Sequence, residues 1–250
     1  MIPTPSTSHV PYEKVYEPAE DSFLFLDTLS SDSEKAFLKN RFNQANDSSN
    51  INCKTPLVVE VGSGSGIVIS FVHAHCETIL GRTDVLTAGI DVNIHACKAT
   101  EKTVSVAELQ SVSHGFYLGN ILGDLTMFLK PKQVDLLIFN PPYVPTPELP
   151  TIPMSDKGDD NMSDNSYLLS LSFSGGHDGM EITDRLLNYL PELLSPEYGC
   201  AYLLLCAQNK PEKVKNMIQN SGNGFLVKTV GVSGKYAGWE KLQIIRIWRE

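Results

Sequence analysis

Short apolar segments alternate with amphipathic, helix-like segments over most of the chain, and this alternation limits the fold more than any other feature of the sequence. The predicted strands cover residues 57–61, 86–91, 114–118, 134–139, 200–206, 225–232 and 242–248. Helices are expected between them at about 66–76, 93–109, 179–194 and 211–221. Strands without polar alternation are typical of a parallel sheet that is covered on both faces. The order therefore predicts an α/β fold with a Rossmann-like, doubly wound, mostly parallel seven-stranded sheet, closed by an antiparallel pair.

We predict that residues 1–250 form one domain, because a chain of this length is sufficient for one α/β core. Its first part, 1–14, is rich in Pro, Ser and Thr and is expected to be flexible. A helical N-terminal segment follows over 15–42, with Pro18 at a helix start, and the Rossmann-like core covers 57–250. Residues 43–55 read as a surface loop. The long stretch 144–178, which includes the acidic residues 156–164, is expected to be a functional or a disordered loop.

The charge and the cysteines exclude several classes of protein. The formal net charge is -9. A protein that binds nucleic acid on its own usually has a basic surface, so this charge argues against autonomous nucleic-acid binding. Five cysteines without a Cys-x-x-Cys pair indicate reduced thiols, and His73 and His75 are spaced so that a helix would point them apart, so no metal site is expected. No signal peptide and no apolar run of roughly 18 residues is present, which favours the cytoplasm or the nucleus and no membrane contact.

A glycine-rich segment after the first strand predicts a nucleotide-type cofactor site. Glu60 ends the strand, and Gly62, Gly64 and Gly66 follow, so the backbone can turn tightly and a ligand can approach it. A carboxylate at Glu60 would repel a pyrophosphate but suits the ammonium of S-adenosylmethionine. The structural alternatives are a buried carboxylate held by backbone N–H groups and a plain strand-to-helix turn.

Two further strand ends complete the expected cofactor pocket. Asp91 ends the second strand, where a carboxylate can accept hydrogen bonds from both ribose hydroxyls, although it could also cap the next helix. Asn120 and Ile121 follow the third predicted strand, where an amide can pair with the adenine amine and an aliphatic side chain can cover the ring. Taken alone, Asn120 is equally typical of a turn.

The segment Asn140-Pro141-Pro142-Tyr143 is the candidate catalytic motif. It follows an apolar strand, so it belongs at the carboxyl edge of the sheet, where ligands bind. Both prolines lack an N–H donor, so the motif presents acceptors: the Asn140 side-chain oxygen and the Pro141 carbonyl. Two acceptors can hold both hydrogens of an NH2 group, and Tyr143 offers a flat face for a planar amide or base. The alternative is a simple proline-rich turn.

Together these segments resemble the HemK-like protein N5-glutamine methyltransferases, and among them the enzymes that act on the eukaryotic class-1 translation release factor. The resemblance rests on residues 15–22 and 60–66, on 135–143, and on 175–179. It implies a class I S-adenosylmethionine-dependent methyltransferase. Its cofactor residues would be Ser22, Glu60, Gly62, Gly64, Asp91, Asn120, Ile121 and Asn140, and its catalytic residues Asn140, Pro141 and Tyr143. The family more often has threonine at Ser22 and aspartate at Asn120.

The same resemblance implies the substrate and a partner. The substrate would be the glutamine of a Gly-Gly-Gln loop, and the partner a small zinc-binding activator subunit that forms a heterodimer at a hydrophobic sheet edge near 114–118. Two other functions compete with this reading. An N6-adenine methyltransferase of DNA or RNA would also need to hold a planar NH2 group, and an inactive scaffold would bind the cofactor only for stability.

Overall fold

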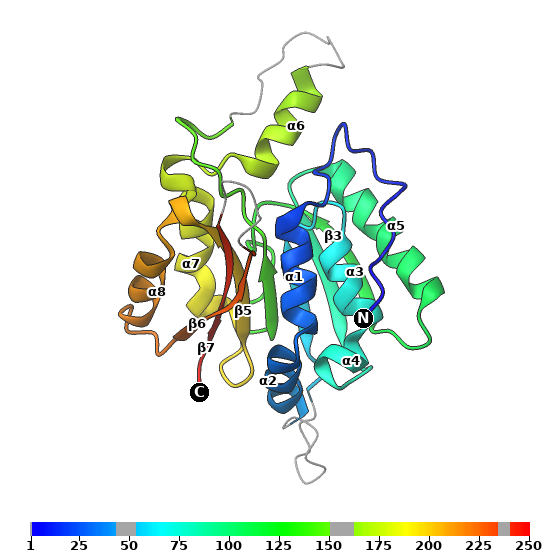
Figure 1. Cartoon of the computed structure of the whole chain (residues 1–250). Coiled ribbons are helices and arrows are strands. Elements are labelled where there is room, and N and C mark those ends of the chain that lie inside the picture. Colours follow the sequence, from blue (N-terminus) through cyan, green and yellow to red (C-terminus); the bar gives the residue numbers. More distant parts are fainter. Residues whose placement is uncertain (1, 44–53, 151–162, 235–240) are drawn as a thin grey trace.

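The computed structural model describes residues 2–43, 54–150, 163–234 and 241–250, and its strands form one sheet (Figure 1). The strand order is β3-β2-β1-β4-β5-β7-β6, parallel except for β7, which pairs antiparallel with both of its neighbours. The bounds are β1 Leu57–Val61, β2 Leu86–Asp91, β3 Phe116–Leu122, β4 Leu136–Phe139, β5 Cys200–Cys206, β6 Leu226–Val232 and β7 Leu242–Trp248. The predicted doubly wound, mostly parallel seven-stranded sheet is confirmed. That the chain is one domain stays a prediction.

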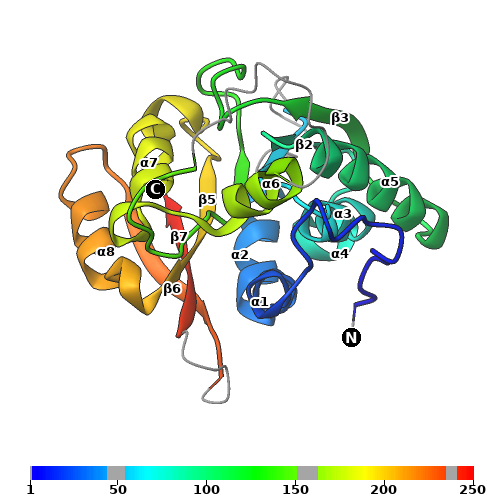
Figure 2. The same ribbon diagram turned by 90° about the horizontal axis from the view of Figure 1, so that it is seen from above.

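Helices cover both faces of this sheet (Figures 1 and 2). One face carries α1 Glu20–Ser30, α2 Asp32–Asn43, α3 Ile67–Ala74, α4 Cys76–Leu80 and α5 Ile94–Gln110. The other carries α7 Glu181–Leu193 and α8 Pro211–Gln219. Because side chains alternate along a strand, Val58 of β1 belongs to the first apolar cluster and Val59 to the second. Two buried cores therefore hold the strand ends in fixed positions.

The N-terminal part departs from the sequence prediction. Residues 2–14, expected to be flexible, pack against the start of α5, where Val10 and Val15 are buried with Ala96 and Ala99. The Asn93 side chain, which caps α5 by accepting from the His95 N–H, also donates to the Lys14 carbonyl (2.7 Å). These contacts bring the segment that precedes α1 to the carboxyl edge of the sheet.

Two further elements differ from expectation. The stretch 144–178 was predicted as a loop, but it contains helix α6 (Ser163–Phe173), which lies above the sheet (Figure 2). Strand β3 runs to Leu122 instead of ending at 118, because Gly119 (φ 103°) lies within the strand, where the pairing with β2 shifts register. Residues 44–53 of the expected surface loop and 156–162 of the acidic stretch lie outside the described residues.

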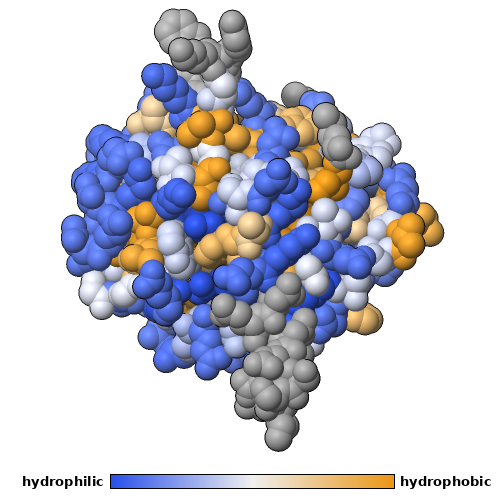
Figure 3. All heavy atoms as spheres, turned by 60° about the horizontal axis from the view of Figure 1, so that its bottom comes forward, coloured by the Kyte–Doolittle hydropathy of each residue, from blue (hydrophilic) through white to orange (hydrophobic). Residues whose placement is uncertain are grey.

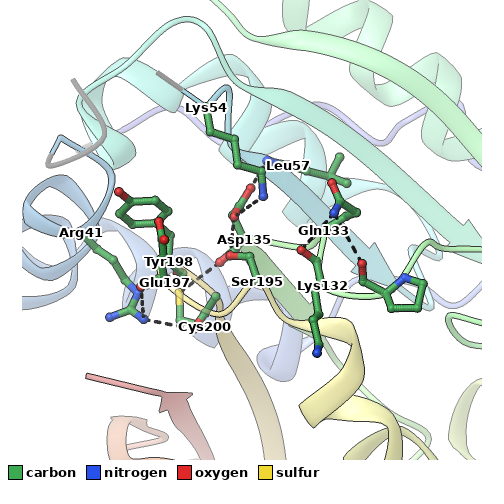
Figure 4. Close-up of polar contacts among 12 residues, drawn as sticks. Arg41, Lys54, Leu57, Lys132, Gln133, Asp135, Ser195, Glu197, Tyr198 and Cys200 are labelled. Carbon is green, nitrogen blue, oxygen red and sulfur yellow. Dashed lines mark hydrogen bonds and ion pairs between the residues drawn. The ribbon is translucent and has the colours of Figure 1, made fainter. Parts of the chain in front are cut away.

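The opposite end of the sheet is fastened by one buried carboxylate (Figure 4). Asp135 accepts hydrogen bonds from the Leu57 N–H (2.9 Å), the Ser195 hydroxyl (2.5 Å) and the Lys54 ammonium (3.1 Å). Close by, the Arg41 guanidinium donates to the Tyr198 and Gly199 carbonyls. These contacts tie β1, β4 and β5 to the segments that precede and follow them at this end. Within the described ranges, no helix combines the length and hydrophobicity that crossing a membrane requires.

Candidate active site

A cavity of about 540 Å³ opens at the carboxyl edge of the sheet, between β1, β2, β4 and α6. Its volume is within the range of about 300–1,000 Å³ that is typical of small-molecule sites. Most of the residues predicted for the site line it: Ser22, Glu60, Gly62, Gly64, Asp91 and Asn140. Asn120, Ile121, Pro141 and Tyr143 are not among the lining residues.

The glycine loop forms the floor of the cavity. Gly62, Gly64 and Gly66 all have positive φ angles (66°, 53° and 78°), which residues with a Cβ rarely adopt. A Cβ on Gly66 would lie 2.6 Å from the Thr100 Cα, so the glycine also permits close packing of the loop on α5. The glycines therefore do more than make a turn: they shape a wall that a ligand can approach.

Glu60 is a buried carboxylate on the cavity wall. Its Oε2 accepts a hydrogen bond from the Ile69 N–H (2.8 Å) near the start of α3. Burial raises the pKa of Glu60 well above the ordinary value, the Ile69 N–H opposes this, and the nearby charge of Asp91 adds to it. The structural alternative, a buried carboxylate held by backbone N–H groups, is thus met in part. It does not explain why the carboxylate also lines the cavity. A cationic ligand would supply the opposite charge that this group lacks.

Asp91 is held in position by backbone donors. Its Oδ2 accepts from the Gly64 N–H (2.9 Å) and its Oδ1 from the Asn93 N–H (2.8 Å). Burial raises the pKa of Asp91, and these backbone hydrogen bonds oppose the rise. The side-chain cap of α5 is Asn93 and not Asp91. Since a carboxylate has about four lone-pair sites, Asp91 keeps acceptor capacity for ligand hydroxyls.

The structure places Asn120 inside β3, away from the position that the sequence prediction gave it. The Asn120 amide donates to the Cys97 carbonyl (2.9 Å), and its oxygen accepts from the Tyr117 hydroxyl (2.7 Å). The residues that line the cavity beyond this strand are Gly123, Asp124 and Leu125. Sequence reasoning missed Asp124, and the signal was available: it is the acidic residue that follows β3 once the strand is extended to Leu122.

Asn140 has one side-chain hydrogen bond and one free acceptor. Its Nδ2 donates to Oδ2 of Asp21 (3.0 Å), a buried residue in the first turn of α1. Among the described residues, its buried Oδ1 has no hydrogen-bond partner. A buried acceptor without a donor costs free energy unless a ligand supplies one. Asp21 thus fixes which end of the amide is left for a ligand.

The Tyr143 end of the motif is held in place by contacts with Asn209 and Gly179. The Asn209 amide donates to the Tyr143 carbonyl (2.9 Å) and to the Asp178 carbonyl (2.9 Å). A Cβ on Gly179 (φ 68°) would lie 2.0 Å from the Tyr143 carbonyl oxygen, so only glycine allows this approach. Pro141 is buried, and the partly buried Tyr143 packs against the first apolar core. Sequence reasoning also missed Asn209, which no local pattern connects with residue 143.

The lining of the cavity is partly apolar and partly charged. Its apolar residues Leu149, Pro150, Tyr167, Leu168 and Leu171 come from the segment after the motif and from α6. Among its charged residues, Arg185 of α7 forms an ion pair with Asp124 (2.5 Å). A mostly apolar lining with a few charged groups is typical of small-molecule sites.

Comparisons with known proteins identify relatives that match the chain over nearly its full length. The chain is 33% identical over 253 residues to the eRF1 methyltransferase catalytic subunit mtq2 of Schizosaccharomyces pombe, covering 100% of this chain and 96% of the relative. It is 30% identical over 249 residues to human Methyltransferase HEMK2, covering 97% and 95%. No family model matches the chain.

Among solved structures, the catalytic domain of hMettl16 in complex with the MAT2A 3′UTR hairpin 6 has a TM-score of 0.54. The match covers 96% of this chain and 74% of that one, and at 13% identity it bears on the fold alone. The two nearly full-length relatives decide the family. This chain is a member of the HemK-like methyltransferase family.

Proposed function

We propose that this protein transfers a methyl group from S-adenosylmethionine to the side-chain amide nitrogen of the glutamine in the Gly-Gly-Gln loop of the eukaryotic class-1 release factor. The observation that carries the proposal is the unpartnered Asn140 Oδ1 on the cavity wall, held outward by Asp21. Such an acceptor can take a hydrogen bond from an N–H group of the substrate. Among full-length relatives the one from fission yeast is named for methylation of a release factor. Because release factors act in the cytoplasm, we propose that this protein is cytoplasmic. The nucleus is the second location that we propose.

The residues of the cavity fit S-adenosylmethionine. Glu60 offers a buried carboxylate to its ammonium, Asp91 offers lone pairs to the ribose hydroxyls, and Gly62 and Gly64 leave room beside the backbone. We assign the adenine end to Asp124 and Leu125 instead of Asn120 and Ile121, because the former pair lines the cavity. Ser22, which follows Asp21 at the start of α1, lines the same space.

The chain itself has to position the amide, which is a poor nucleophile because its lone pair is delocalised. The Asn140 Oδ1 would accept one N–H of the glutamine amide, which orients the nitrogen lone pair. The carbonyl of Pro141, a residue that does not line the cavity, stays the second acceptor that the sequence predicts. When bound, S-adenosylmethionine would supply an electrophilic methyl group on a sulfonium; its sulfur would depart as a neutral thioether, and the strongly acidic methylated nitrogen would lose one proton to water. No strong base is then required, so orientation and electrostatics provide most of the catalysis.

We also propose that β3 binds the zinc-binding activator subunit. It is the last strand of the sheet on its side, and one row of its side chains is apolar and exposed. Phe116 is 63% exposed and Leu118 60%, and after the register shift the partly buried Ile121 lies on the same side of the strand. Leu109 in the last turn of α5 and Val112, which follows this helix, are exposed apolar residues as well. Monomeric proteins rarely leave a patch of this kind uncovered.

The substrate is tested with a panel of acceptors. We expect methyl transfer to the release factor and none to a release factor in which the loop glutamine is alanine, nor to DNA or RNA. Asn140→Ala should reduce turnover by more than about 100-fold, because the oriented acceptor is lost, while cofactor affinity stays nearly unchanged. Asn216→Ala, at an exposed position of α8, is the matched control. Transfer only to nucleic acid, or normal turnover by Asn140→Ala, would refute the proposal.

The Asp21 carboxylate should matter for turnover more than for cofactor binding. In Asp21→Ala the Asn140 amide loses a charge-assisted hydrogen bond, so kcat should fall by about 10- to 100-fold. Asp21→Asn keeps an acceptor and should recover part of the loss. Asp27→Ala, exposed on the same helix, should behave like the wild type. An unchanged kcat in Asp21→Ala would show that Asn140 is oriented by other means.

Cofactor binding should release protons and weaken as the pH falls. The pKa of Glu60 is raised by burial, so a fraction is protonated in the free protein, and a cationic ligand favours the ionised form. Affinity should therefore decrease as the pH drops through this raised pKa. Calorimetry in two buffers that differ in ionisation enthalpy measures the released protons, and Glu60→Gln should remove the effect. Identical heats in both buffers would argue against ionised Glu60 as the partner of the ammonium.

The proposed activator edge is tested by co-purification. Leu118→Glu places a charge in the centre of the exposed row on β3 and should abolish recovery of the small zinc-binding subunit. Met217→Glu changes an exposed apolar residue on α8, which packs on the other face of the sheet, and should leave recovery intact. Equal recovery with both variants would place the interface elsewhere.

A further inference from the structure

A second group of chemically active side chains lies at the end of the sheet opposite the cavity. His73 near the end of α3, Glu108 near the end of α5 and His114 just before β3 converge there. One ligand atom from each lies within 4.8 Å of the others. The His73 Nε2 is 3.0 Å from Oε1 of Glu108, and the His114 Nδ1 is 3.9 Å from the same oxygen. In the sequence His73 stands two positions from His75, but in the fold its ring lies beside that of His114.

His73 is prepared for ligation by its surroundings. Its side chain is fully buried, and its Nδ1 lies 2.8 Å from the hydroxyl oxygen of Thr87 in β2. A hydroxyl can donate or accept, so Thr87 can also stabilise the tautomer that leaves the Nε2 lone pair free. A metal-binding histidine typically has its second ring nitrogen held by a hydrogen bond in this way.

The other two groups leave the site open to solvent. The side chains of Glu108 and His114 are 34% and 39% exposed, so an ion can enter and water can complete its coordination. The rings of His73 and His114 lie 5.3 Å apart and nearly stacked, both beside Glu108. Bond lengths of about 2.0–2.1 Å place the ligand atoms of a tetrahedral zinc ion roughly 3.3 Å apart. The observed separations bracket this value. The His114 Nδ1 also lies 2.9 Å from the Gly115 carbonyl oxygen, so this exposed ring has to turn away from that contact to bind an ion through Nδ1.

We propose that His73, Glu108 and His114 form a zinc-type metal site that is separate from the cofactor cavity. Two imidazoles and one carboxylate favour zinc or a related transition metal over magnesium or calcium, which prefer oxygen ligands. The three ligands come from α3, α5 and the residue stretch that leads into β3, so a bound ion would fasten this edge strand to the helices that cover it. The role is structural and does not depend on the proposed methyl transfer.

The test is a zinc titration of the full chain in competition with a chromophoric chelator, after treatment with EDTA. We expect one zinc ion per chain and a melting temperature that rises with zinc concentration, because the ion binds only the folded state. Glu108→Gln and His114→Ala should each weaken zinc binding by at least about tenfold, since each removes one of three ligands. Both positions are partly exposed, so both variants are expected to fold.

His95→Ala, which changes a histidine at the other end of α5, is the matched control and should bind zinc like the wild type. X-ray absorption of the zinc-loaded chain should show imidazole scattering, reduced in His114→Ala. Zinc binding that is equally strong in the wild type and in both ligand variants would overturn the proposal. So would the absence of any zinc-dependent rise in melting temperature. Either result would leave His73 and Glu108 as a hydrogen-bonded pair that joins two helices.

Discussion

The hydrogen bond between Asp21 and Asn140 is the interaction on which the candidate active site depends. It joins residues 119 positions apart, one in the first turn of α1 and the other at the end of β4. An asparagine amide alone has no preferred end, and a neighbouring carboxylate, which only accepts, decides which end it turns to the ligand. The two apolar cores matter for the chemistry because they hold α1 and β4 close enough for this bond.

The motif is also restrained from the opposite side. Asn209 binds the carbonyl of Tyr143, and the glycines at 175 and 179 let their chain lie directly against that backbone. Two prolines remove most of the remaining freedom. A reaction that relies on aiming a weak nucleophile gains from such rigidity, because a displacement of about 1 Å can cost about 100-fold in rate. The long connection after β4 therefore supports the site and does not merely link two elements.

The strands could be predicted from the sequence because their hydrophobicity is continuous, and the glycine loop and the Asn-Pro-Pro-Tyr motif could be located because they follow strands. The misplacement of Asn120 has a local cause: Gly119 resembles a strand end but lies within β3. Asp21, Asn209 and the group around His73 could not be found, because their partners lie 30 or more positions away. Helix α6 was missed since its segment was read by its prolines and acidic residues.

The edge strand β3 has a consequence for handling the protein. It ends the sheet with a row of apolar side chains that face solvent, and its outer backbone groups have no neighbouring strand among the described residues. A surface of this kind can add a strand from another copy as readily as from a cognate subunit. If the proposed activator subunit covers this edge, solubility becomes a property of the pair, and the concentration of the isolated chain sets how long it stays in solution. In Figure 3 a hydrophobic patch stands at the right-hand rim, on the side where α5 lies in Figure 1.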